Sequence, residues 1–87
     1  MTYAEERVAA EMGRALMAIY RAGWQVRLWP DALSGRAGAR LMSASERARG
    51  ARSLRSVTGA GESPLQALYA AVQRLNERAG AVVVRLD

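Results

Sequence analysis

The sequence predicts a small two-layer α+β domain in which two helices pack on a small antiparallel sheet, in the order α-β-β-β-α-β. Two segments show the helical spacing of apolar residues behind a capping residue, and the stretches between and after them have strand-like patterns. With 87 residues, the chain has the length of one domain, so residues 1–87 are expected to fold as a single unit.

The first predicted helix begins after Thr2 and ends at Gly23. Thr2 and Glu5 have the spacing of a capping box, in which each side chain satisfies a backbone N–H group at the helix start. Gly23 is typical of the residue just past a helix end. Between them, apolar residues recur three and four positions apart, which predicts one buried face: Val8, Met12, Leu16 and Ile19.

The first predicted strand covers residues 24–29 and stops at Pro30 and Asp31. Its side chains alternate between apolar and mixed character, so the two sets should lie on opposite faces of the sheet. The set expected to face the helix is Trp24, Val26 and Leu28, and the set expected on the other face is Gln25, Arg27 and Trp29.

The middle of the chain is less clearly patterned. Residues 31–38 are expected to form a loop, residues 39–45 a second strand, and residues 52–58 a third, with a turn at residues 47–50. An alternative is a short helix over residues 43–52, because Ser43 and Glu46 also have the spacing of a capping box.

The second predicted helix begins after Ser63, with Pro64 in its first turn and Gln66 completing the capping pattern. It ends at Gly80, and residues 81–87 are rich in valine and are expected to form a last strand. The buried stripe of this helix consists of Leu65, Leu68, Val72 and Leu75.

The segment before this helix, residues 59–63, is expected to be a turn in which Gly59 and Gly61 supply positive φ angles. Glycines between a strand and a helix also occur in phosphate-binding loops. Here Pro64 removes one N–H group at the helix start and Glu62 adds a negative charge, so the sequence favours the turn.

The net charge of the chain is concentrated in one segment. The whole chain carries +5, and residues 34–58 alone carry +5, so the rest of the chain is neutral. We call residues 34–58 the basic strip. Such a strip attracts polyanions or acidic protein surfaces. The candidate binding residues are the six arginines of the strip together with two side chains of the first strand: Arg36, Arg40, Arg47, Arg49, Arg52, Arg55, Arg27 and Trp29.

The composition points away from catalysis. The chain has no histidine and no cysteine, and its eight acidic residues are scattered, so neither a catalytic site, a metal site nor a cofactor is expected. No segment has the apolar run of a signal peptide or of a membrane span. We therefore expect a cytoplasmic protein without a membrane partner. Its 18 alanines predict a thin core, which a homodimer would complete.

One stretch resembles the double-stranded-RNA-binding domain, a family with the order α-β-β-β-α. The resemblance lies in the pattern Gly59-x-Gly61-x-Ser63, followed by Ala67, Ala70 and Ala71. Where that family carries phosphate-binding lysines, this chain has Pro64, Leu65 and Leu68. The resemblance therefore implies the fold of the family and not its mode of RNA binding.

The pattern over residues 61–72 is also similar to the strand-to-helix segment of HicB-type antitoxins. A third resemblance, to small phage and prophage proteins of the α/β sandwich type, lies in Gly23, Trp24, Val26, Leu28 and residues 63–68. The resemblance to small phage proteins implies a steric inhibitor of a larger host complex, of the anti-CRISPR type. Such an inhibitor would act in the host cytoplasm through a basic surface. The alternatives are a nucleic-acid-binding module that uses the same arginines and a HicB-like antitoxin component.

Overall fold

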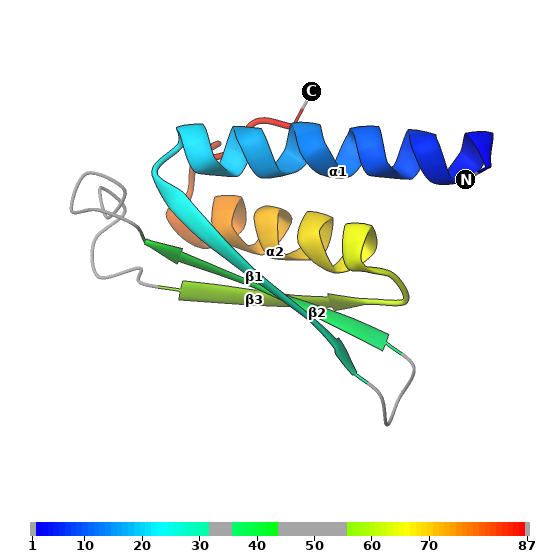
Figure 1. Cartoon of the computed structure of the whole chain (residues 1–87). Coiled ribbons are helices and arrows are strands. Elements are labelled where there is room, and N and C mark those ends of the chain that lie inside the picture. The colour runs from blue at the N-terminus through cyan, green and yellow to red at the C-terminus, as the bar shows by residue number, and fades with distance from the viewer. Residues whose placement is uncertain (1, 32–35, 44–55, 87) are drawn as a thin grey trace.

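A computed structural model describes residues 2–31, 36–43 and 56–86 of the chain. Two helices and three strands follow one another in the order α-β-β-β-α, so the predicted α+β class is confirmed (Figure 1). The elements are α1 (Tyr3–Arg21), β1 (Trp24–Asp31), β2 (Arg36–Ser43), β3 (Ser56–Gly61) and α2 (Pro64–Ala79). Neither helix is long and apolar enough to cross a membrane within the described residues.

The two helix starts are capped as the sequence predicts. The Thr2 hydroxyl accepts a hydrogen bond from the Glu5 backbone N–H at 3.2 Å, and the Ser63 hydroxyl accepts one from the Gln66 backbone N–H, also at 3.2 Å. Each bond satisfies an N–H group that has no partner inside the helix. Gly80 ends α2 in the left-handed conformation, with φ of 70°.

The three strands form one antiparallel sheet with β2 in the centre. The sheet includes residues that the sequence assigned to a loop, because β1 continues through Pro30 and Asp31 and β2 already begins at Arg36. Pro30 is tolerated because β1 is an edge strand, where a missing N–H group need not break the ladder. β3 continues to Gly61, three residues past the predicted end of the third strand, whereas the predicted residues 52–55 lie outside the described residues. The predicted turn at residues 47–50 and nearly all of the alternative helix at 43–52 lie outside the described residues.

Gly59 and Gly61 have a different role from the predicted one. Both belong to β3, and neither is among the described glycines with positive φ. Their importance is the close approach of α2. A Cβ atom at Gly59 would overlap the backbone nitrogen of Ala71, and one at Gly61 would lie 2.6 Å from the Cβ of Gln66. The prediction of a positive-φ turn was therefore wrong, and the glycines instead let helix and strand touch.

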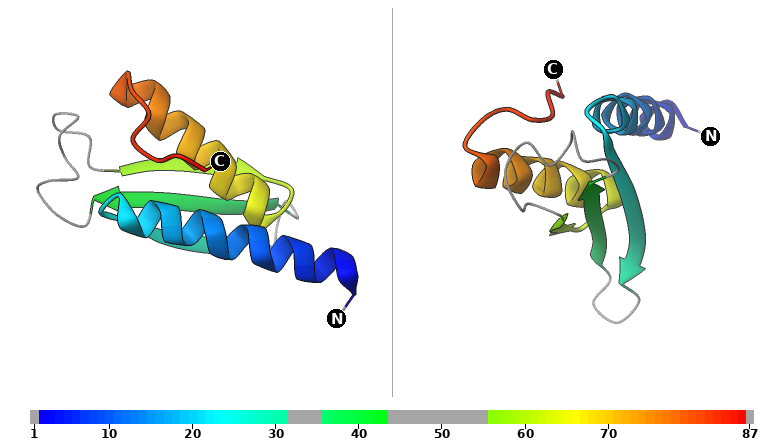
Figure 2. Two further views of the ribbon diagram at one scale, coloured as in Figure 1. Left: turned by 90° about the horizontal axis from the view of Figure 1, so that it is seen from above. Right: turned by 90° about the vertical axis from the view of Figure 1, so that its left-hand side faces the viewer.

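The predicted C-terminal strand is also wrong for the described residues 81–86, which form no strand. This tail turns back along α2 (Figure 2). The Asn76 side chain accepts hydrogen bonds from the N–H groups of Val83 and Val84, at 2.8 and 3.0 Å, and donates one to the Val84 carbonyl at 3.0 Å. These bonds satisfy backbone groups that a neighbouring strand would otherwise pair. They also hold Val84 in the core.

The core lies between the sheet and the two helices, which cover the same face of the sheet (Figure 1). α2 buries five of its residues and α1 buries only Ala15 and Ile19, so α2 forms most of the contact with the sheet. Among the described residues, Trp24 is the largest fully buried side chain, and its indole N–H has no hydrogen-bond partner there. The other fully buried large side chains are Ile19, Leu41, Val57, Leu68, Leu75 and Val84.

Candidate binding surface

The other face of the sheet is covered by neither helix. Successive residues of a strand point to opposite faces, and paired residues on neighbouring strands point to the same face. Since Trp24, Leu41 and Val57 lie in the core, the residues that alternate with them lie on the opposite side. We call this side the open face. Its described members are Gln25, Arg27, Trp29, Arg36, Gly38, Arg40, Met42, Ser56, Thr58 and Ala60.

Four of the eight predicted binding residues meet on the open face. Arg27 and Trp29 come from β1, and Arg36 and Arg40 come from β2. All four side chains are exposed. The predicted outward orientation of Gln25, Arg27 and Trp29 is therefore correct. The other four predicted binding residues, Arg47, Arg49, Arg52 and Arg55, lie outside the described residues.

Two arginines stand directly opposite each other in the register of β1 and β2. Arg27 pairs with Arg40, and Arg40 also donates a hydrogen bond to the Ser56 hydroxyl at 3.4 Å. Like charges at directly opposed positions destabilise a sheet. The only acidic residue in the described strands is Asp31, whose register partner is Arg36 rather than either member of the pair. Arg27 and Arg40 therefore place two positive charges on neighbouring strands of the open face, with no acidic register partner, and such charges attract an anion.

Trp29 lies beside this arginine pair and packs on Gly38, its register partner on β2. A Cβ atom at Gly38 would overlap two atoms of the indole ring and lie 2.7 Å from its Nε1 atom. The absence of a side chain at Gly38 therefore makes room for the ring. Trp29 nevertheless keeps 40% of its surface exposed. The open face thus presents an aromatic ring next to two cations.

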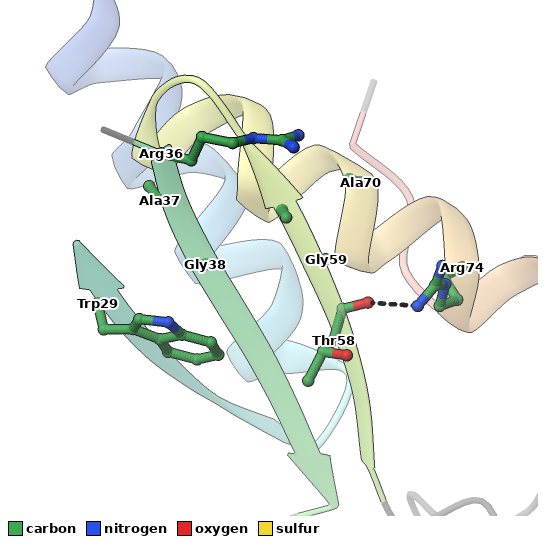
Figure 3. A pocket seen from close by; sticks show the side chains of 9 residues that line it. Trp29, Arg36, Ala37, Gly38, Thr58, Gly59, Ala70 and Arg74 are labelled. Carbon is green, nitrogen blue, oxygen red and sulfur yellow. Dashed lines mark hydrogen bonds between the residues drawn. The ribbon is translucent and has the colours of Figure 1, made fainter. Parts of the chain in front are cut away.

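A hollow of about 660 Å³ continues from Trp29 across β3 to α2 (Figure 3). Small residues form its floor. They are Gly38 on β2 and the consecutive Thr58, Gly59 and Ala60 on β3. At the far side, Arg74 of α2 donates a hydrogen bond to the Thr58 carbonyl at 3.3 Å. The hollow therefore has Trp29 at one end and Arg74 at the other, with Arg36 also in its lining.

Sequence reasoning did not include Arg74 or Thr58 among the binding residues. Arg74 is one of several charged residues on the polar side of α2, and no sequence pattern distinguishes it from its neighbours. The small residues at 58–60 were the available signal, since they reduce the bulk of β3 and let an α2 side chain reach its edge. The sequence was instead interpreted as a strand that ends at Thr58, followed by a turn over residues 59–63.

No group of three or more acidic, histidine or cysteine side chains that could hold a metal ion occurs within the described residues. The ligand-binding potential of the site therefore rests on arginine, tryptophan and small polar groups. Comparison of the chain with protein-family models, with curated proteins and with solved structures found no match.

Proposed function

We propose that this chain is a non-enzymatic binding protein whose open face binds nucleic acid. The observation that carries the proposal is the Arg27–Arg40 pair, exposed and directly opposed on neighbouring strands, with Trp29 beside it. Each feature has a matching group in a nucleic acid, because phosphates supply negative charge and bases supply flat rings.

The arginine pair is suited to phosphate. A guanidinium group presents several N–H donors in one plane and binds phosphate oxygens in a bidentate manner. In the free protein, Arg27 and Arg40 repel each other, and a bound anion relieves this repulsion. Binding therefore gains from the new hydrogen bonds and from the neutralised charge.

Trp29 favours nucleic acid over an acidic protein surface as the partner. An acidic protein surface would satisfy the arginines through carboxylates, but it need not supply a planar group for an exposed indole. Nucleic-acid-binding sheets combine cations with aromatic side chains on which bases stack. The neighbouring positions of Trp29 and Arg27, two residues apart on one strand, have this combination.

The test is a titration of labelled oligonucleotides with the full chain at two salt concentrations. We expect binding at low salt, and a loss of about tenfold in affinity for Arg27→Ala or Arg40→Ala, because each removes a charged hydrogen-bond donor. Each substitution should also reduce the slope of log affinity against log salt by roughly 0.7 to 0.9. Arg14→Ala is the matched control, since Arg14 is an exposed arginine on α1, which lies on the other side of the sheet.

Absence of binding at low salt would overturn this proposal. The same surface would then be a candidate for docking on an acidic protein, which is the hypothesis of a steric inhibitor of a host complex. Affinity capture from a nuclease-treated host lysate, with Arg27→Ala and Arg14→Ala compared side by side, would test that second hypothesis.

A further inference from the structure

We infer that the open face takes single-stranded rather than duplex nucleic acid, with one unpaired base on Trp29 and the strand crossing β3 toward Arg74. This inference rests on the proposed function and specifies the form of nucleic acid that the site accepts. It is carried by three observations: the exposed indole, the shallow floor of the hollow, and the position of Arg74.

The exposed indole favours an unpaired base. Trp29 is supported by Gly38 beneath it and retains 40% exposure. In a duplex, each base is already stacked between its neighbours, so a side chain on a flat sheet cannot reach its face. A single strand can turn one base outward and stack it on the ring. The Arg27–Arg40 pair lies two residues along the strands, roughly 7 Å away, within reach of that nucleotide's phosphate.

The hollow provides a path for the rest of the strand. From β1 to β3 the sheet extends roughly 10 Å, because neighbouring strands are about 4.8 Å apart. Along this path Gly38 and Ala60 are register partners with little or no side chain, so the floor stays low. A short stretch of the strand therefore spans the distance between Trp29 and the β3 edge.

Arg74 lies where this path leaves the sheet. One of its guanidinium nitrogens is fixed by the Thr58 carbonyl, and the side chain is exposed. A guanidinium group has five N–H donors, so most of them remain for a phosphate. The bond to Thr58 orients the group without using its charge, and Arg74 is therefore suited to hold the far end of the strand.

The start of α2 offers no alternative site for a duplex. Pro64 and Leu65 line an apolar groove with Val8 and Met12 of α1, and no arginine is part of this lining. The cations and the aromatic ring gather instead on the open face.

The experiment measures the binding of a labelled 12-nucleotide single strand of mixed sequence, and of its duplex, to the full chain at the same two salt concentrations. We expect the single strand to bind about tenfold or more tightly, because only an unpaired base gains the stacking on Trp29. Tryptophan fluorescence should fall on binding, since Trp29 is exposed while Trp24 is fully buried and serves as a constant background.

Variants separate stacking from general charge attraction. Trp29→Ala should weaken single-strand binding roughly 5- to 150-fold, the range for one lost base–aromatic stack. Trp29→Phe should retain part of the affinity but abolish the quenching. Arg74→Ala should reduce the salt slope for the single strand by about 0.7, whereas Arg14→Ala should leave it unchanged. Circular dichroism of each variant checks that the fold is intact.

Two outcomes distinguish this inference from the proposed function. If the duplex binds as tightly as the single strand and Trp29→Ala has no effect, while Arg27→Ala and Arg40→Ala still weaken binding, the inference is overturned and the proposed function stands. If neither form binds at low salt, both are overturned.

Discussion

The two faces of the sheet differ in what their residues do, although the residues alternate along the same strands. On the covered face, Leu41 is fully buried against the helices, and on the open face its neighbour Arg40 is exposed. The covered face depends on volume and shape, because α2 approaches β3 closely enough to exclude a Cβ atom. The open face depends on charge and on an aromatic ring. Stability and binding are therefore expected to be separable by substitutions only one residue apart.

The largest change in stability is expected when two neighbouring residues of β2, one on each face of the sheet, are replaced separately. Leu41→Ala should lower the free energy of unfolding by about 2–5 kcal/mol, because it leaves a cavity between sheet and helices. Arg40→Ala should change it by less than about 1 kcal/mol, because the side chain is exposed and the loss of its repulsion with Arg27 is itself a small effect. Urea denaturation followed by circular dichroism measures both values. A similar loss of stability in the two variants would show that the open face contributes to stability as much as the covered face does.

The next largest change in stability is expected from replacing two glycines that lie on opposite faces of the sheet. Gly59→Ala should cost about 1–3 kcal/mol, because the new Cβ meets the backbone of α2, which cannot move independently. Gly38→Ala should cost clearly less, because the atoms in its way belong to the Trp29 side chain, which can rotate.

The same pair has a spectroscopic signature. Gly38→Ala should displace the indole of Trp29 and make its fluorescence more accessible to a soluble quencher such as iodide. Gly59→Ala should leave the Trp29 signal unchanged below the unfolding transition. Equal losses of stability in the two variants would mean that Trp29 is as immobile as the helix backbone.

The smallest change in stability is expected when the charge repulsion between Arg27 and Arg40 is removed in the free protein. Arg27→Gln removes one of two opposed like charges, so it should raise the free energy of unfolding by about 0.2–1 kcal/mol at low salt. The gain should shrink near 1 M salt, where the screening length is only about 3 Å. Thermal unfolding at the two salt concentrations measures the change. A loss of stability at low salt would show that the pair is not repulsive.

The parts that the sequence predicted correctly are those determined by neighbouring residues. Thr2 and Ser63 each cap a helix through a bond to a residue three positions along the chain, and such a spacing is visible in the sequence. The alternation in residues 24–29 likewise assigned Arg27 and Trp29 to the open face.

The parts that it missed depend on contacts between distant segments. Gly59 has the sequence context of a turn, and only the packing of α2 against β3 explains its presence in a strand. Residues 81–84 have the composition of a strand. However, the Asn76 side chain accepts hydrogen bonds from the Val83 and Val84 N–H groups, so these groups do not pair with a neighbouring strand. Arg74 joins the site through a bond to Thr58, 16 residues away, and no local pattern indicates such a bond.

The attachment of the C-terminal tail through Asn76 has a consequence for how the molecule opens. Because one side chain supplies all three of these hydrogen bonds, the tail can detach in a single local step while the sheet stays paired. In hydrogen exchange, the amides of Val83 and Val84 should therefore exchange together and faster than those of β2. The release of Val84 would transiently open the core beside Val72, so this end of the domain is where unfolding is expected to begin.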